Sequence, residues 1–229
     1  MSKRVSHSLL DPWIGPPIKA IYPRLGIPTW FPPEGIVLLG HLSAIFGSIG
    51  FALSTKYWWG GIMFAIGVAG NHFADCIDGT HARSTGQCRN GGELLDHFTD
   101  PLSFAYWIVG WSIAASDWQY GMAGLIVMYA TAVLTNIKAK MLGEFTLATF
   151  GPTEFKTGLV GLGMSLAMMH FLQPSYVENT VWVSLRISVI VGAGQLGKGL
   201  VSAVREVNQN GAPPDTSEWE TVRENKSDL

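Results

Sequence analysis

Four aspartates lie close together in one short stretch of this 229-residue chain. Asp75 and Asp78 are three residues apart, and Asp96 and Asp100 are four apart. In a helix, spacings of three and four place both members of a pair on one face. We expect two antiparallel neighbouring helices, joined by a loop of about a dozen residues, to bring the two pairs face to face. Carboxylates gathered in this way repel one another and need cations.

The residue types indicate which cations and which chemistry. Aspartate oxygens suit hard ions such as Mg²⁺ or Mn²⁺, and two divalent ions would match four negative charges. A two-ion site is a common device for displacement at a phosphoryl group. Alternatively, one carboxylate stays free to take a proton from a hydroxyl nucleophile. The structural alternative is that the aspartates cap helix ends and pair with Arg83, Arg89 or solvent.

The residues around the aspartates are small or basic. Gly79 and Ala82 lack bulk beside the first pair, and Gly92 lacks it beside the second. This leaves room for a planar or phosphorylated group to approach the backbone. Arg83 can offer a fork of N–H donors to a phosphate.

The composition of the chain indicates what kind of secondary structure holds the aspartates in place. Only 14% of the residues are charged, 48% are hydrophobic and the formal net charge is −2, so a basic surface for nucleic acid is excluded. Five uncharged stretches are nearly long enough to span a bilayer as helices, and a sixth apolar segment carries only two charges. Together they predict an all-α integral membrane protein with six transmembrane helices. The five uncharged stretches and then the sixth segment are residues 35–55, 57–74, 101–116, 118–137, 157–177 and 179–204.

Lysine and arginine positions predict the orientation, and the apolar and polar stretches predict the domain limits. Short loops rich in these residues are typically cytoplasmic, so the aspartates and both termini are expected to face the cytoplasm. We expect residues 1–34 to form an N-terminal cytoplasmic segment, part of it lying along the membrane surface. Residues 35–205 form the six-span domain, and residues 206–229 form a polar tail.

The motif as a whole resembles a known family. Its spacing is similar to the full signature of the CDP-alcohol phosphotransferases: Asp75-x2-Asp78-Gly79-x2-Ala82-Arg83-x8-Gly92-x3-Asp96-x3-Asp100. The resemblance implies an integral membrane enzyme of phospholipid synthesis that transfers the phosphoalcohol of a CDP-alcohol to a hydroxyl acceptor and releases CMP. One of the two substrates is a lipid.

The same resemblance implies roles for the motif residues. Asp75, Asp78 and Asp96 would hold the two Mg²⁺ or Mn²⁺ ions, and Asp100, also near a metal, would be the base. The CDP site would be shaped by Gly79, Ala82, Arg83 and Gly92. The family resemblance and the small residues on the helix faces are compatible with a homodimer, although the sequence does not establish one.

Two strings favour one substrate class. Residues 92–97, Gly-Glu-Leu-Leu-Asp-His, are similar to a string of choline and ethanolamine phosphotransferases, which use diacylglycerol as acceptor. Residues 150–154, Phe-Gly-Pro-Thr-Glu, resemble another of their elements, in which Glu154 would contact the ammonium headgroup. Glu154 could equally be a helix-start residue whose charge suits the dipole. The short chain is typical of the alternative class, which passes the phosphatidyl group of CDP-diacylglycerol to a soluble alcohol such as inositol, serine or glycerol phosphate.

Overall fold

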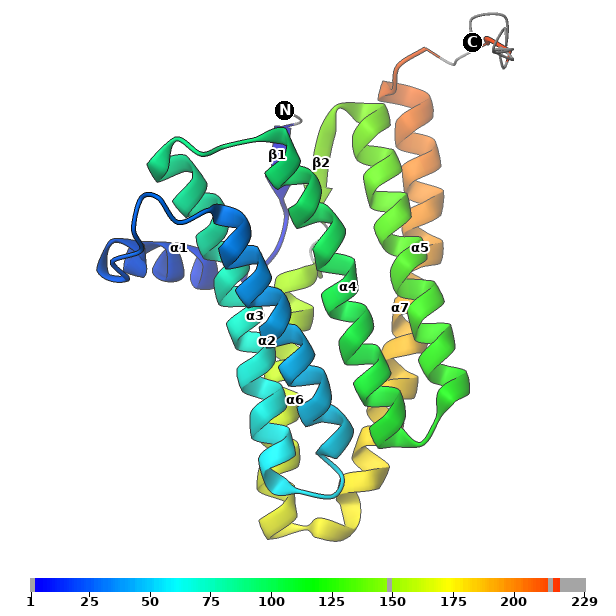
Figure 1. Cartoon of the computed structure of the whole chain (residues 1–229). Coiled ribbons are helices and arrows are strands. Elements are labelled where there is room, and N and C mark those ends of the chain that lie inside the picture. The colour runs from blue at the N-terminus through cyan, green and yellow to red at the C-terminus, as the bar shows by residue number, and fades with distance from the viewer. Residues whose placement is uncertain (1–2, 148–149, 214–215, 219–229) are drawn as a thin grey trace, which may run out of the picture.

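In the part of the chain that the structure describes, six long helices stand side by side and a seventh, short helix lies across them (Figure 1). The computed structural model describes residues 3–147, 150–213 and 216–218. The long helices α2 to α7 form the bundle, and the short α1 runs crosswise at the end where the chain begins (Figure 1). The α-helices of the described residues are α1 Asp11–Ile21, α2 Pro33–Leu53, α3 Trp58–Thr85, α4 Asn90–Ala115, α5 Trp118–Leu142, α6 Pro152–Leu172 and α7 Val177–Asn210.

The helix ends follow from local residue chemistry. Pro33 and Pro152 occupy the first positions of α2 and α6, where a missing N–H is not needed. Gly86 and Gly143 follow the ends of α3 and α5 with φ of +70°, a left-handed conformation that glycine adopts without strain. Asp117 caps α5 by accepting a hydrogen bond of 3.2 Å from the Tyr120 N–H.

The helical class predicted from the sequence is confirmed, and each predicted apolar stretch overlaps one long helix, although α3, α4 and α6 extend beyond their stretches at one end. Within the described residues, four helical segments are long and apolar enough to cross a membrane, against the six spans predicted: Pro33–Leu53, Trp118–Leu142, Pro152–Leu172 and Pro174–Asn210. The last segment joins α7 to a short 3-10 turn, Pro174–Tyr176. Helices α3 and α4 are not among these four, and their ends carry the charged motif.

The helices pack in an order that differs from the one expected. We expected α3 and α4 to be packed neighbours joined by a loop of about a dozen residues. Within the described residues, α3 packs mainly on α2 and α6, while α4 packs on α2, α5 and α7. The connection is only residues 86–89, because both helices extend through the motif. Helix α2 therefore bridges the two helices that carry the aspartates.

Glycines allow the helices α2, α3 and α6 to approach closely. A Cβ at Gly67 of α3 would lie 2.3 Å from the Cα of Gly47 on α2. A Cβ at Gly61 of α3 would lie 2.4 Å from the carbonyl oxygen of Gly163 on α6. Backbones can approach this closely only where side chains are absent, which is the role that small residues have in membrane bundles.

Aromatic residues fill the centre of the bundle. Phe51 stacks on Phe64 with ring centroids 4.0 Å apart, and both are fully buried. The indole N–H of Trp107 donates to the Ala44 carbonyl and that of Trp111 to the Val181 carbonyl, each at 3.1 Å. Buried tryptophans thus satisfy their one polar atom while they join separate helices.

An ion pair links two helices at the end of the bundle opposite the aspartates. Arg186 of α7 donates to Asp117 from Nε at 3.0 Å and from Nη2 at 2.8 Å. These hydrogen bonds hold the pKa of Asp117 below its ordinary value. The guanidinium also lies 3.5 Å from the ring centroid of Trp182. Arg186 is therefore engaged within the protein.

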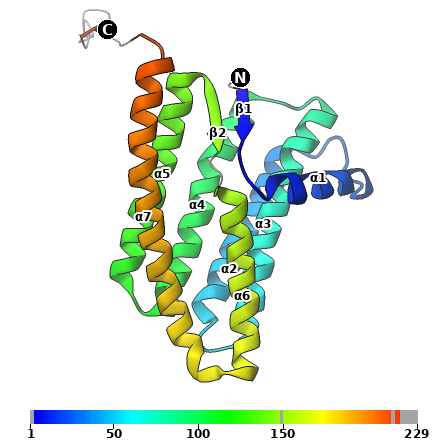
Figure 2. The ribbon, with the colours of Figure 1, turned by 180° about the vertical axis from the view of Figure 1, so that it is seen from behind.

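The beginning of the chain is tied to the connection between α5 and α6. Strand β1, Lys3–Ser6, pairs in parallel with β2, Glu144–Leu147. From β1 the chain passes to α1, which packs on α3 (Figure 2). Within the predicted tail, α7 continues to Asn210, and residues 214–215 and 219–229 lie outside the described residues.

Candidate active site

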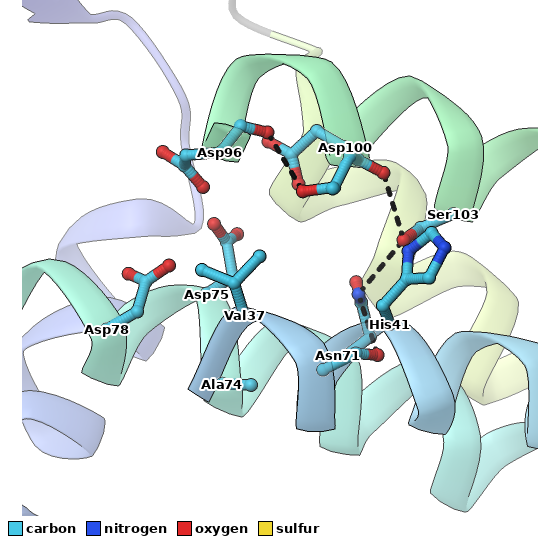
Figure 3. A pocket seen from close by; sticks show the side chains of 11 residues that line it. Val37, His41, Asn71, Ala74, Asp75, Asp78, Asp96, Asp100 and Ser103 are labelled. Atoms are coloured by element: carbon cyan, nitrogen blue, oxygen red, sulfur yellow. Dashed lines mark hydrogen bonds between the residues drawn. The ribbon is translucent and has the colours of Figure 1, made fainter. Parts of the chain in front are cut away.

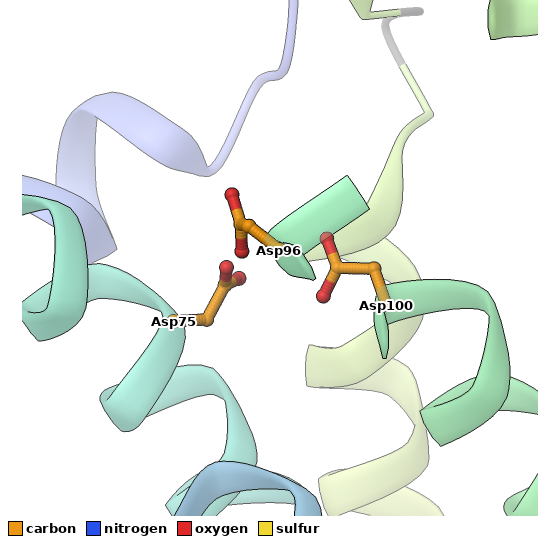
Figure 4. Close-up of side chains that lie close together, drawn as sticks. All are labelled: Asp75, Asp96 and Asp100. Atoms are coloured by element: carbon orange, nitrogen blue, oxygen red, sulfur yellow. The ribbon is translucent and has the colours of Figure 1, made fainter. Parts of the chain in front are cut away.

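Three of the four motif aspartates converge on one point. Asp75 comes from α3, and Asp96 and Asp100 come from successive turns of α4 (Figure 4). Each can place one carboxylate oxygen within 4.8 Å of the others. The side chains are half-buried, so they are partly withdrawn from water yet still accessible. The prediction that the two pairs face each other is confirmed for these three residues.

Asp78 lies in the same pocket but not in the same group. It lines the pocket with the other three aspartates, as Figure 3 shows, and is 7% exposed. One carboxylate oxygen accepts a hydrogen bond from the adjacent Gly79 N–H. Asp78 therefore binds the backbone of its own helix, and it lies outside the group formed by Asp75, Asp96 and Asp100.

The main surprise of the site is Lys156. This residue comes from the second turn of α6, and its side chain is only 2% exposed. Its Nζ lies 3.1 Å from an oxygen of Asp75 and 4.0 Å from an oxygen of Asp100. From the sequence, Lys156 is one of the lysines at cytoplasmic helix ends that could form a basic pocket for an acceptor phosphate, and its contact with the aspartates was not predicted. One signal was present, since a lysine near the positive N-terminal end of an apolar helix is unfavourable unless it has an anionic partner.

The donor set fits a hard divalent cation. The group consists of carboxylate oxygens from Asp75, Asp96 and Asp100, with no sulfur or nitrogen ligand among them. A buried ammonium already sits beside two of these carboxylates, which shows that the cluster requires positive charge. The structure thus supports a cation site, while the identity and number of the ions remain predictions.

The residues expected to bind CDP flank the aspartates on both helices. Arg83 is exposed, and its side chain turns back over Gly79, since a Cβ at Gly79 would lie 3.2 Å from Nη1 of Arg83. Ala82 is half-buried on the same helix. Gly92 lies in the first turn of α4, where an added Cβ would be 3.7 Å from a carboxylate oxygen of Glu34. A guanidinium over a bare backbone is a suitable surface for phosphate.

Glu154 is engaged by the N-terminal segment. One carboxylate oxygen accepts from the Ser8 hydroxyl at 2.6 Å and from the Leu10 N–H at 3.0 Å. The other accepts from the Gly151 N–H at 2.8 Å, and the residue is 7% exposed. These contacts correspond to the helix-start interpretation and add a tether for residues that lie far away in the sequence. Contact of Glu154 with a substrate headgroup remains a prediction.

The variant Glu154→Gln separates these two roles. A glutamine keeps the shape but loses the charge that strengthens hydrogen bonds to Ser8 and Leu10. If Glu154 is a tether, the midpoint of thermal unfolding falls and the KM for the CDP-alcohol does not change. If Glu154 contacts an ammonium headgroup, the KM rises in the folded fraction. A KM rise with unchanged thermal stability would contradict the tether role.

A second connection holds the N-terminal segment against the motif helix. His81 is fully buried between two partners, Tyr22 Oη at 2.8 Å from Nδ1 and the Phe31 carbonyl at 2.8 Å from Nε2. Because a carbonyl only accepts, Nε2 of a neutral ring donates to it, and Nδ1 accepts from the tyrosine. His81 therefore holds α3 in place next to Ala82 and Arg83 instead of pointing at the aspartates.

Comparison with known proteins places this geometry in a family. The family model described as CDP-alcohol phosphatidyltransferase matches residues 32–193. The chain therefore belongs to the CDP-alcohol phosphatidyltransferase family, as the motif predicted. The matched region contains all four aspartates and the long helices α2 to α6, with the first half of α7.

Three relatives illustrate the range of similarity. Cholinephosphotransferase 1 of Homo sapiens is 29% identical over 179 residues, which cover 72% of this chain and 43% of the relative. Choline/ethanolaminephosphotransferase 1 of Saccharomyces cerevisiae is 26% identical over 175 residues, 72% of this chain and 43% of the relative. Archaetidylinositol phosphate synthase of Pyrococcus horikoshii is 30% identical over 117 residues, 51% of this chain and 59% of the relative. The chain thus spans about half the length of these curated relatives.

Proposed function

We propose that this protein is a membrane enzyme that transfers phosphocholine or phosphoethanolamine from the CDP-alcohol to the hydroxyl of diacylglycerol and releases CMP. The observation that carries the proposal is the convergence of Asp75, Asp96 and Asp100 in one pocket. Membership of the family supports the reaction type. The names of the human and yeast relatives support the choice of aminoalcohol.

The proposed reaction is a displacement at phosphorus. Asp100 takes the proton of the acceptor hydroxyl, and the oxygen then forms a bond to the phosphorus that carries the alcohol. The bond between that phosphorus and the bridging oxygen breaks, so CMP leaves with the electron pair. Asp75, Asp78 and Asp96 would hold two Mg²⁺ or Mn²⁺ ions, which supply charge stabilisation to the phosphoryl oxygens when bound. Arg83 and the surfaces of Gly79, Ala82 and Gly92 position the CDP group.

The proposed setting is a six-span membrane domain. Helices α2 to α7 would cross the bilayer, and α3 and α4 would do so with their motif ends at the cytoplasmic surface. The crosswise α1 would lie along that surface, which suits its position at the motif end of the bundle. Loops rich in lysine and arginine support cytoplasmic placement of the pocket and both termini. The small residues on the helix faces are also compatible with a homodimer.

A second candidate acceptor class has one observation in its favour. The similarity to archaetidylinositol phosphate synthase extends over 117 residues. In this alternative, CDP-diacylglycerol is the donor and a soluble alcohol, which could carry a phosphate, is the acceptor. An acceptor phosphate would then need a basic pocket, for which Lys138, Lys140 and Lys156 are the candidates. Lys138 pairs with Glu206 at 2.7 Å and Lys156 with Asp75 at 3.1 Å, so either lysine would have to leave a carboxylate to bind the phosphate.

Release of CMP from the purified protein in lipid tests the proposal. One reaction contains CDP-choline or CDP-ethanolamine with diacylglycerol, and the other contains CDP-diacylglycerol with inositol, serine or glycerol phosphate. We expect CMP in the first reaction with Mg²⁺ or Mn²⁺ and none after addition of EDTA. CMP in the second reaction alone would establish the alternative. No CMP in either reaction would contradict both.

A further inference from the structure

Lys156 combines features that rarely occur together. It lies near the N-terminal end of an apolar helix, where the helix dipole disfavours a cation, and its side chain is almost fully buried. A buried ammonium is costly unless anionic partners surround it. Here the partners are the carboxylates of Asp75 and Asp100, and both residues belong to the group that can hold a metal ion.

The ammonium and a divalent ion would compete for the same negative charge. Nζ of Lys156 is 3.1 Å from Asp75, the distance of a direct hydrogen bond, and 4.0 Å from Asp100. A cation bound by these carboxylates would be a close neighbour of the ammonium. Two positive charges at such short range in a buried site repel strongly. Occupation of the site by a metal ion therefore favours movement of the ammonium away from Asp75.

The surroundings of Lys156 offer a place for the displaced ammonium. Nζ lies 5.7 Å from the centroid of the Phe104 ring, which is within the range of a cation–π interaction. Phe104 in turn packs on Phe155, the residue before Lys156, with centroids 5.6 Å apart. A small rotation of the lysine side chain would keep its apolar stem enclosed while its head leaves Asp75.

We propose that Lys156 is a positioning residue that substitutes for the metal charge. It holds Asp75 and Asp100 together in the metal-free enzyme and gives up its bond to Asp75 as a divalent ion binds. Lys156 thereby weakens metal affinity and stabilises the arrangement of the carboxylates whenever no ion is bound. This inference rests on the metal site of the proposed function.

Metal binding to the variant Lys156→Met tests the inference without any measurement of turnover. Methionine retains the length and apolar stem but removes the charge. We expect Mn²⁺, followed by its electron paramagnetic resonance signal, to bind the variant about tenfold more tightly than the wild type or better. We also expect the thermal midpoint in EDTA to fall and added Mn²⁺ to restore it. If the variant can be purified only with Mn²⁺ present, its unfolding after chelation of the Mn²⁺ also supports the inference.

Two further variants distinguish charge from packing. Lys156→Arg keeps a positive charge, so its Mn²⁺ affinity should not rise. Lys138→Met removes the same charge from an ion pair with Glu206, which is separate from the aspartates, and should leave Mn²⁺ binding unchanged. Equal Mn²⁺ affinity in wild type and Lys156→Met would overturn this inference but not the proposed metal site. Absence of Mn²⁺ binding in both would overturn the proposed metal site, and the inference with it.

Discussion

Replacing Asp100 with asparagine is expected to lower the rate of CMP release by about 10²–10⁴-fold, because a positioned general base contributes that much to proton transfer. Asparagine cannot accept the hydroxyl proton, although its carbonyl oxygen can still face the cluster. Asp75 and Asp96 remain in place, so Mn²⁺ binding should be largely retained. Single-turnover CMP release at saturating substrate, with Mn²⁺ binding measured in parallel, checks both parts.

The matched control is Asp117→Asn, which makes the same chemical change at the opposite end of the bundle. Asp117 caps α5 and pairs with Arg186, so this variant should lose thermal stability. Its CMP release per folded molecule should equal that of the wild type. If Asp100→Asn turns over at a similar rate to this control, Asp100 is not the base, and another group takes the proton.

Placing a single methyl group at Gly163 is expected to disturb the packing of α6 on α3. A Cβ there would lie 2.7 Å from the carbonyl oxygen of Gly61 and 3.1 Å from the backbone nitrogen of Ala65. Backbone atoms cannot rotate away, so the helices must separate. Overpacking of this kind costs about 1–3 kcal/mol. The corresponding fall in the thermal midpoint of Gly163→Ala is about 5 °C.

Gly161→Ala is a control on the same helix. A Cβ at Gly161 meets nothing within 4 Å, so the substitution adds only the helix preference of alanine. Its midpoint should stay equal or rise slightly. Because Lys156 is carried by α6, we also expect Gly163→Ala to weaken the contact between Lys156 and Asp75, whereas Gly161→Ala should not. A similar thermal midpoint in the two variants would show that the close approach of α3 and α6 is not needed for stability.

The positions of the long helices follow from local sequence, and their packing order does not. Uncharged stretches marked all six long helices because apolar segments and proline or glycine punctuation are local features. The helical spacing of the aspartates indicated helix at both pairs, but the further extension that leaves only residues 86–89 as the connection was not visible, since a charged stretch resembles a loop in composition. The strands β1 and β2 are four residues each, and helices α1 to α5 lie between them in the sequence, so no local pattern indicated their pairing.

The same distinction applies to the site. Spacing on a helix was enough to place Asp75 with Asp96 and Asp100, because all three lie on the faces of two helices that continue through the motif. It did not reveal Lys156, which reaches the cluster only because α6 packs on α3. Nor did it reveal that Ser8 would bond to Glu154, a contact that spans most of the chain.

The order of residues along the chain has a consequence for how the protein is made. Asp75, Asp96 and Asp100 leave the ribosome before Lys156, and β1 is synthesised long before β2, its partner. Until Lys156 is synthesised, the carboxylates lack their internal cation, so they must be solvated by water, protonated or paired with free ions. The N-terminal segment, likewise, must wait for α6 before Ser8 and Leu10 can meet Glu154. Assembly of the pocket is thus a late event in biosynthesis, because α6 must be synthesised before the residues that precede it can contact it.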